Sequence, residues 1–386
     1  MVPRMYLFCR IARRQEQHTR PAQVYWVRRR SSAWRRFVLV AALGGGMGVV
    51  VATADDLQRY TGTCRSMGVA WTVSLYAPSA TAAEEAVAAA HAEVRRLEQV
   101  LSDYLPDSEL SQLSATAPTQ SPVSVGDDLW QVLTRSVFLR NASGGAFDPT
   151  VGPLTTLWRR ARRSGRLPLP ERLAGARRAV GPDTLVLNPG NQAVALTRPG
   201  MRLDLGGIGM GYAIDRALNV LRDRGITAAM IDASGDIGVT GPPPGTAGWR
   251  VEVDPLGRRG SRQATADKSD PLVLTLADAA VTTSGDAFQA VEIDGVRYSH
   301  IVDPRTGLGV VGGSGVTVVA ADATTADALA TTLSVLGPTA GLPLVEQTPA
   351  AAARFVTLQA GKPVATESSR WSTRITPAAQ IQAQTN

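Results

Sequence analysis

The spacing of apolar residues predicts helices in three segments of the chain. In residues 81–104, 127–145 and 211–225, apolar positions recur every three to four residues, as they do in helices that bury one face. Thr81 is a suitable N-cap for the first helix, and the glycine pair 144–145 would end the second.

Other segments have the character of strands. They are short runs of apolar and β-branched residues bounded by turn-forming residues. The six segments of this kind are 71–77, 184–188, 193–197, 228–234, 249–254 and 272–284. The chain contains no internal repeat, so a repeat architecture is not predicted.

Three features follow neither pattern. Residues 159–178 hold eight Arg and one Glu, and such a charge run is typical of a solvated loop. The polar tail 376–386 is predicted to be disordered. His91 lies among alanines inside the first helix, and we expect a structural or surface role for it.

The N-terminal segment 1–54 has the order of a secretory signal. A basic region ending in RRRSSAWRRF precedes the apolar run FVLVAALGGGMGVVVA and the small residues 52–54, which read Ala-Thr-Ala. The run is short and interrupted by glycines, so we predict a cleaved signal and keep an uncleaved inner-membrane anchor as the alternative. Arg35 and Arg36 leave twin-arginine export open beside the general route. The expected location is the periplasm or cell envelope.

Charge and cysteine content narrow the picture. The 386 residues are 44% apolar and 19% charged, as in an ordinary globular protein. The formal charge is +7, but segment 1–54 holds ten Arg and one acid, so the remainder carries −2 and nucleic acid is not an expected partner. After that segment only Cys64, His91 and His300 remain as thiol or imidazole groups, so any metal would be held by oxygen.

Glycines and paired oxygens suggest where the chemistry lies. The loop 204–211 places four glycines directly before a predicted helix, which allows a phosphate to approach the backbone. In the segment DATTADALATTLSVLG, read as a helix, Asp327 and Thr331 lie four residues apart and share a face. Mg²⁺ accepts one or two protein oxygens and completes its shell with water and phosphate, so this pair predicts half of a cation site. The alternative is a solvated helix face.

Six motifs in order resemble the bacterial FAD:protein FMN transferase family. They are LSDYLPDSELSQL, GGAFDPTVGPL, DLGGIGMGYAID, VTTSGDAF, YSHIVDPRTG and VTVVAADATTADALATTLSVLG, and they span about Gly62 to Phe355. The resemblance implies an α+β fold, with mixed sheets and packed helices, for a flavin transferase domain at 55–375. It also implies Mg²⁺-dependent transfer of FMN from FAD to a Thr or Ser hydroxyl of a partner flavoprotein, with release of AMP.

The resemblance also assigns expected roles to residues. Asp327, Thr331 and a carbonyl at Gly207 match the family's magnesium ligands. The positions that match its FAD contacts are Met67, Tyr104, Ala146, Phe147, Asp148, Asp204, Met210 and Ile301. His300 falls near the pyrophosphate. The chain departs from the family pattern at Met210, where Lys is common, and at residues 154–165, which replace a glycine-aromatic sequence.

Some questions stay open at this level. Asp286, Asp204 and His300 are all candidates for the base that takes the proton of the acceptor hydroxyl. An FAD pyrophosphatase that releases FMN and AMP, or an FAD-binding protein of the same fold, remains an alternative function. The resemblance implies that the acceptor is an exported or membrane FMN-binding flavoprotein.

Overall fold

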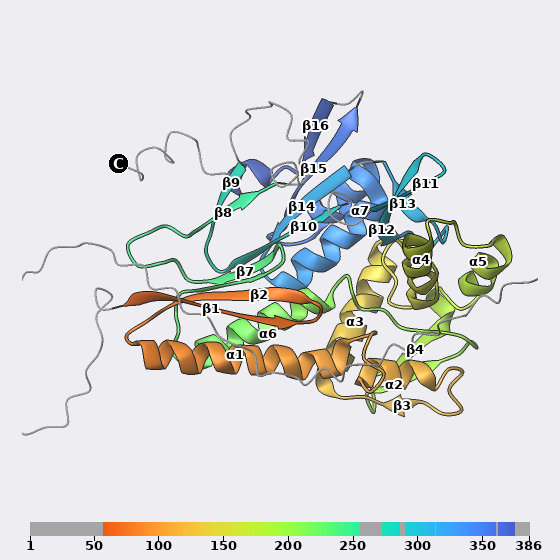
Figure 1. Cartoon of the computed structure of the whole chain (residues 1–386), viewed down its shortest axis with the longest axis horizontal. Coiled ribbons are helices and arrows are strands. Elements are labelled where there is room, and N and C mark those ends of the chain that lie inside the picture. The colour runs from red at the N-terminus through yellow and green to blue at the C-terminus, as the bar shows by residue number, and fades with distance from the viewer. Residues whose placement is uncertain (1–56, 255–271, 286–289, 313, 360–361, 375–386) are drawn as a thin grey trace, which may run out of the picture.

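A central antiparallel sheet of eight strands organises the molecule (Figure 1). The computed structural model describes residues 57–254, 272–285, 290–312, 314–359 and 362–374, so the predicted leader, the predicted tail and Asp286 lie outside the described residues. In spatial order the strands are β1 (Gln58–Ser66), β2 (Val69–Ala77), β6 (Ala229–Ala233), β7 (Asp236–Thr240), β10 (Ala279–Gly285), β14 (Ser314–Ala320), β15 (Ala352–Gln359) and β16 (Lys362–Glu367).

Alternation along the strands gives this sheet two buried faces. In β14, Val318 and Ala320 belong to the main core, while Val319 between them packs into a second cluster on the opposite face. Three helices cover the main face: α1 (Ala80–Leu101), α6 (Gly209–Asp223) and α7 (Ala323–Gln347). The opposite face is covered by the hairpin of β8 (Trp249–Val253) and β9 (Leu272–Leu276) and by the short helix η4 (Trp371–Arg374).

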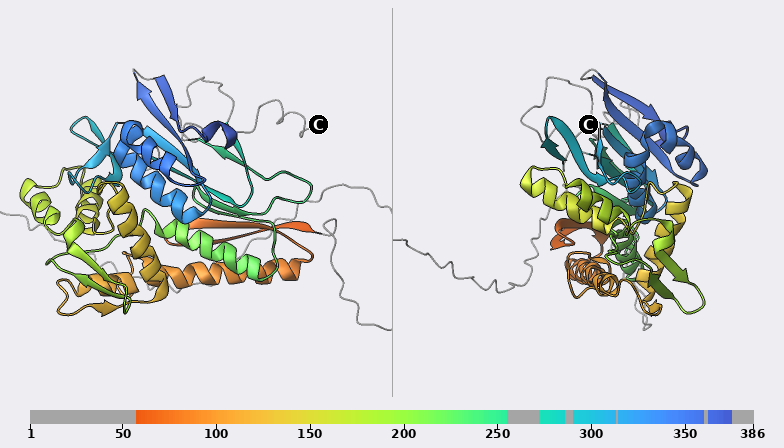
Figure 2. Two further views of the ribbon diagram at one scale, coloured as in Figure 1. Left: turned by 180° about the vertical axis from the view of Figure 1, so that it is seen from behind. Right: turned by 90° about the vertical axis from the view of Figure 1, so that its right-hand side faces the viewer.

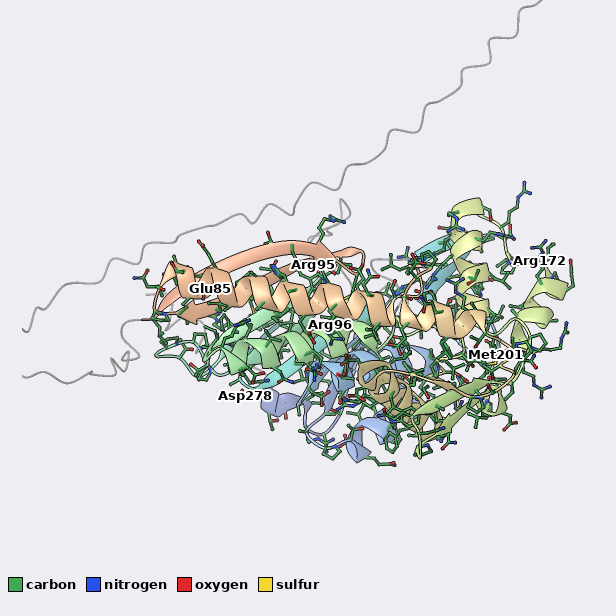
Figure 3. All side chains as sticks on the ribbon, turned by 90° about the horizontal axis from the view of Figure 1, so that it is seen from below. Glu85, Arg95, Arg96, Arg172, Met201 and Asp278 are labelled. Atoms are coloured by element: carbon green, nitrogen blue, oxygen red, sulfur yellow. The ribbon has the colours of Figure 1, made fainter. Side chains whose placement is uncertain are left out.

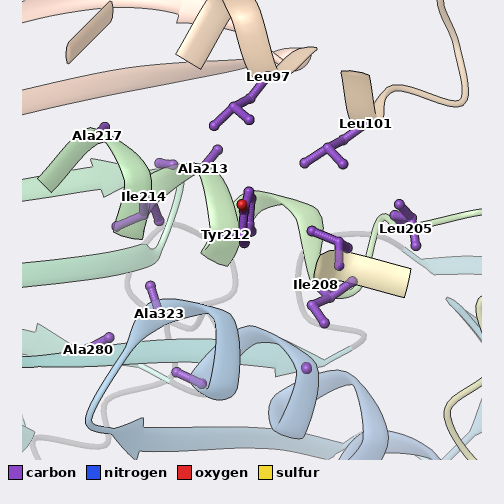
Figure 4. Packing of buried hydrophobic residues seen from close by; sticks show 14 of the residues in the cluster. Leu97, Leu101, Leu205, Ile208, Tyr212, Ala213, Ile214, Ala217, Ala280 and Ala323 are labelled. Atoms are coloured by element: carbon purple, nitrogen blue, oxygen red, sulfur yellow. The ribbon is translucent and has the colours of Figure 1, made fainter. Parts of the chain in front are cut away.

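The outer helix α1 shows how the sequence pattern becomes packing. Glu85 and Arg95 lie on its exposed face (Figure 3), whereas Leu97 and Leu101 point at Tyr212 and Ala213 of α6 (Figure 4). Burying a side chain such as Leu97 stabilises the fold by about 1.5–3 kcal/mol. His91 was expected to have a structural or surface role, and it is buried in the same helix, which excludes the surface alternative.

A lobe of shorter elements lies at one end of the molecule (Figures 1 and 2). Its helices are α2 (Glu109–Ala115), α3 (Asp127–Ala142), α4 (Gly152–Ser164), α5 (Pro170–Arg177) and the short η2 (Pro182–Thr184). One small sheet has the order β3 (Val123–Ser124), β5 (Ala193–Leu196), β4 (Leu185–Asn188). The other has the order β11 (Ala290–Ile293), β12 (Val296–Val302), β13 (Gly309–Val311).

Most predicted elements are confirmed, with three corrections. The N-cap of α1 is Ser79, whose side chain accepts a hydrogen bond from Ala82 N, so Thr81 lies inside the helix. Segment 272–284 forms two strands, because the chain turns at Asp278 with a φ of 46°.

The third correction concerns the charge run 159–178, which is not a solvated loop. It contains the second half of α4 and all of α5. Leu154, Trp158 and Ala161 form a buried stripe on α4 that packs against Ile293 and Val302. The stripe is hard to detect in the sequence, because three apolar residues are enough to pack the helix against the lobe and the residues around them are mostly arginines.

One helix of the described residues, α7, is long and apolar enough to span a membrane by length and composition. Here it is a core helix against β10 and β14, with a break at Gly337, where φ is 68°. The far edge of the central sheet is β16, in which all six residues are exposed.

Candidate active site

The glycine-rich loop lies directly against one face of α7. A Cβ on Gly207 would be 2.8 Å from Thr331 Cγ2, and a Cβ on Gly211 would be 2.1 Å from the carbonyl oxygen of Ala323. Neither glycine has a positive φ. These positions therefore require glycine for close approach to α7 and not for an unusual backbone conformation.

Asp327 joins the two helices. Its side chain is 4% exposed, and its Oδ2 accepts a hydrogen bond of 3.0 Å from the backbone N–H of Gly211, in the first turn of α6. The N-cap residue of α6, Ile208, has no side-chain oxygen to offer, so Asp327 serves an N–H group that would otherwise lack a side-chain cap. Thr331, one turn further along α7, is half-buried beside Gly207.

Three carboxyl groups lie close together at Asp327. Burial raises the pKa of Asp327 well above its ordinary value, and repulsion from Asp236 in β7 and Asp215 in α6 adds to the rise, while the Gly211 N–H opposes it. Burial also raises the pKa of Asp236 to about 7. Within the described residues no Lys or Arg forms an ion pair with Asp327 or Asp236. Buried carboxylates without a counter-charge favour a bound cation.

The donor set fits Mg²⁺ in chemical type. Asp327 offers a carboxylate, Thr331 a hydroxyl and Gly207 a backbone carbonyl, all oxygen. A Cβ on Gly207 would lie 2.9 Å from Thr331 Oγ1, so the absence of a side chain at residue 207 lets the loop backbone lie directly beside this hydroxyl. In the described part of the chain no three His, Cys, Asp or Glu side chains converge as ligands, so water and substrate would supply the remaining positions.

Two further aspartates fix the start of α7. Asp215 accepts hydrogen bonds of 2.8 Å from the N–H groups of both Ala323 and Thr324. Asp322, the N-cap, accepts from Thr325 N at 2.8 Å. The helix that carries Asp327 is therefore anchored from α6 and from its own cap, which holds the candidate ligands in place.

A second polar cluster surrounds Asp204, at the start of the loop. Its Oδ2 accepts from Thr155 Oγ1 at 2.7 Å and from Arg159 Nη2 at 2.9 Å, and its Oδ1 accepts from Gly206 N at 2.9 Å. Arg159 also pairs with Asp103. Burial and the nearby Asp204 raise the pKa of Asp103, and Arg159 opposes that rise. In this cluster one guanidinium therefore bridges two carboxylates.

Tyr104 lies on top of this cluster. Its ring is 71% exposed, and the guanidinium carbon of Arg159 lies 4.2 Å from the ring centroid. A cation under an exposed aromatic ring holds the ring in place and leaves its other face open for stacking. The resemblance to the transferase family implied roles for Tyr104 and Asp204 but not for Asp103, Thr155 and Arg159. The spacing of Thr155 and Arg159, four apart on α4, was the available signal.

The remaining predicted residues have varied positions. Met67, with a φ of 49°, is at the tip of the β1–β2 hairpin. Its backbone N–H donates a hydrogen bond of 2.8 Å to Glu98 Oε1 of α1. Met210 is half-buried in the first turn of α6. His300 is half-buried in β12, next to the buried Ile301.

The turn at 146–148 is buried throughout. Ala146, Phe147 and Asp148 are each at most 5% exposed. Asp148 Oδ1 accepts from the N–H and the hydroxyl of Thr150 at 2.9 and 2.6 Å. The structure thus brings together Gly207, Asp327 and Thr331, and links them through the loop to Asp204 and Tyr104.

Comparison with known proteins gives a consistent result. The model of the ApbE family matches residues 67–355. The FAD:protein FMN transferase of Treponema pallidum is 33% identical over 278 residues, which are 68% of this chain and 74% of that protein. The FAD:protein FMN transferase of Escherichia coli K12 is 29% identical over 280 residues, covering 71% of this chain and 77% of that protein.

Solved structures have the same fold. The apo flavinyl transferase ApbE of Pseudomonas stutzeri aligns with a TM-score of 0.71 and 27% identity, over 82% of this chain and 97% of that one. The flavin transferase ApbE of Vibrio cholerae aligns with a TM-score of 0.71 and 26% identity, over 82% and 99% of the two chains. The expected α+β flavin transferase fold is confirmed.

Proposed function

The chain belongs to the ApbE family and is an enzyme of the FAD:protein FMN transferase type, and we propose that it attaches FMN from FAD to a Thr or Ser of a partner protein, using Mg²⁺. The observation that carries the proposal is the convergence of Gly207 and Thr331 with a buried Asp327 that lacks a counter-charge. The acceptor would be an exported or membrane FMN-binding flavoprotein.

The proposed reaction is a phosphoryl transfer, in which one bond to phosphorus forms and one breaks. The acceptor oxygen bonds to the FMN phosphorus of FAD, the bond from that phosphorus to the bridging oxygen breaks, and AMP leaves. Bound Mg²⁺ would neutralise charge on the pyrophosphate oxygens. Asp327 would supply the negative charge of the metal site, and Thr331 and Gly207 neutral oxygens. The anchored start of α7 would keep this geometry unchanged during turnover.

Asp204 suits a binding role better than a basic one. Both of its oxygens already accept hydrogen bonds, one of them from Arg159, so neither is free to take the proton of an acceptor hydroxyl. We therefore assign Asp204 to positioning the flavin nucleotide together with Tyr104. His300 and Asp286 remain the candidates for the base that accepts the hydroxyl proton.

Export is part of the proposal. The basic and apolar order of segment 1–54 supports a cleaved signal and a periplasmic or cell-envelope location. N-terminal sequencing of the protein from the cell envelope should give a start near Asp55. An intact Met1 on protein from the cytoplasm would contradict this location.

The deciding experiment separates three activities. The protein is incubated with FAD and Mg²⁺, with and without an FMN-binding acceptor domain, and AMP and the acceptor mass are measured. AMP formed together with a mass increase equal to FMN, dependent on the acceptor, supports transfer. AMP without acceptor identifies a pyrophosphatase, and intact FAD under both conditions identifies a binding protein.

A further inference from the structure

A cavity of about 500 Å³ lies in the lobe, apart from the metal site. It is bounded by the end of α3, the turn at 144–148, the end of α5 with the following turn, and the turn after β12 (Figure 1). Three arginines line it: Arg140, Arg177 and Arg305. Of all the residues expected to contact FAD or metal, only Asp148 lines this cavity.

Arg140 is the unusual member of this group. Its side chain belongs to α3, the residue is 6% exposed, and neither Nε nor Nη1 has a hydrogen-bond partner. A guanidinium cannot lose its proton in a protein, so burial does not make it neutral. A buried guanidinium whose N–H groups lack partners is destabilising. An anion in the cavity would offset its charge.

The other polar groups of the cavity are largely committed. Arg305 pairs with Asp303 through two contacts of 2.9 Å, and Arg177 Nη2 donates to the carbonyl oxygen of Arg305 at 2.9 Å. These contacts hold two cations at the mouth. The Asp148 carboxyl accepts hydrogen bonds from Thr150 and attracts Arg140 electrostatically, but the two do not form a salt bridge among the described residues. The lining therefore has an excess of positive charge.

We propose that this cavity binds the phosphate group of a small phosphate monoester, held by Arg140 and Arg177, at a site separate from that of FAD. Several arginines around one tetrahedral dianion match its many acceptor oxygens, whereas a carboxylate has two. The volume leaves room for the organic part of the ligand. The run 159–178, with eight Arg and one Glu, leads to the mouth and would raise the local anion concentration.

The test measures binding directly and needs no transfer activity. Inorganic phosphate and ribose 5-phosphate are titrated into the full chain by calorimetry at constant ionic strength. Saturable binding is expected, and Arg140→Met should weaken it by about tenfold to a hundredfold, as for the loss of a charge-assisted hydrogen bond. The control is Arg172→Met, since Arg172 extends from α5 outside the cavity (Figure 3) and should leave binding unchanged.

Folding and competition arms complete the design. Arg140→Met should fold with an unfolding temperature at least equal to that of the wild type, because it removes a buried unpaired charge. If Arg140→Met does not fold, the exposed Arg177→Met serves instead, with an expected severalfold loss of affinity. The proposal is overturned if neither variant changes phosphate binding, if the wild type binds citrate but not phosphate, or if saturating FAD displaces phosphate.

Discussion

Buried carboxyl groups have different partners in two regions, the interface of α6 and α7 around Asp327 and the cluster of Asp204 with Arg159 of α4. Around Asp327 the acids of three elements gather and no arginine or lysine of the described residues pairs with them. Around Asp204, Arg159 bridges two carboxylates and Arg202 places a second positive charge near Asp103, so the charges of the cluster balance. The difference teaches how to interpret buried carboxyl groups. A buried carboxyl group with no arginine or lysine partner indicates a site for a bound cation, whereas carboxyl groups paired with an arginine hold the surrounding segments in place.

Removing the uncompensated charge should have the largest effect. Asp327→Asn keeps the shape and an acceptor for Gly211 N but loses the negative charge of the proposed metal site. FMN attachment to an acceptor domain should fall about a thousandfold, the scale expected when a charge-stabilising group is lost. The measurement is transfer rate across a Mg²⁺ titration.

The matched control is Asp322→Asn, on the same helix. Asn remains a good N-cap, so its transfer rate should stay near that of the wild type. If folded Asp327→Asn keeps the transfer rate and the Mg²⁺ dependence of the wild type, Asp327 only caps α6. The absence of a cationic partner would then not indicate a metal site.

Crowding the interface should have the next largest effect. A Cβ at Gly211 would be 2.1 Å from a backbone oxygen of α7, so Gly211→Ala should force the two helices apart. The free energy of unfolding should fall by about 1–3 kcal/mol or more. Gly175→Ala in α5 is the control, because its Cβ would meet nothing closer than 3.8 Å. Urea denaturation of both variants should give opposite signs.

Unbalancing the compensated cluster should affect binding more than chemistry. Arg159→Met leaves Asp103 and Asp204 facing each other and removes the cation under Tyr104. The KM for FAD should rise about tenfold, the scale of one or two lost charge-assisted contacts, with a smaller change in kcat. Arg160→Met, its exposed neighbour, should leave both constants unchanged. A fall in kcat at constant KM would show that Arg159 acts in the chemical step.

His91 is a third kind of buried titratable group, because it becomes neutral on burial by losing its proton. Burial and the nearby Arg95 lower its pKa from 6.5 to about 4, so the folded protein keeps it neutral while the unfolded chain protonates near pH 6.5. Stability is therefore lost as pH falls below 6.5, by about 1 kcal/mol between about pH 7 and about pH 5.5. His91→Leu should remove that part of the slope in thermal unfolding. An unchanged slope would assign it to other groups.

The sequence predicted most elements because their apolar periods are strong, and it predicted Asp327 and Thr331 as a pair because helical spacing is local. It missed Asp236 and Asp215, since their proximity to Asp327 arises only when β7 and α6 pack beside α7. Arg159 was hidden in a charge run, and its partners Asp103 and Asp204 come from the segment after α1 and from the loop before α6, which meet α4 only in the folded protein. Local sequence patterns can therefore predict ligating residues that share one helix, but they cannot predict the charged residues that distant segments bring next to them.

The last strand of the central sheet has a consequence for the protein in concentrated solution. An open sheet ends in unpaired backbone groups, which a second copy could extend into an aggregate. β16 carries Lys362 and Glu367 at its two ends, and Pro363 removes one N–H from the pairing pattern. All six side chains of this strand are exposed. These features disfavour the pairing of two copies through β16.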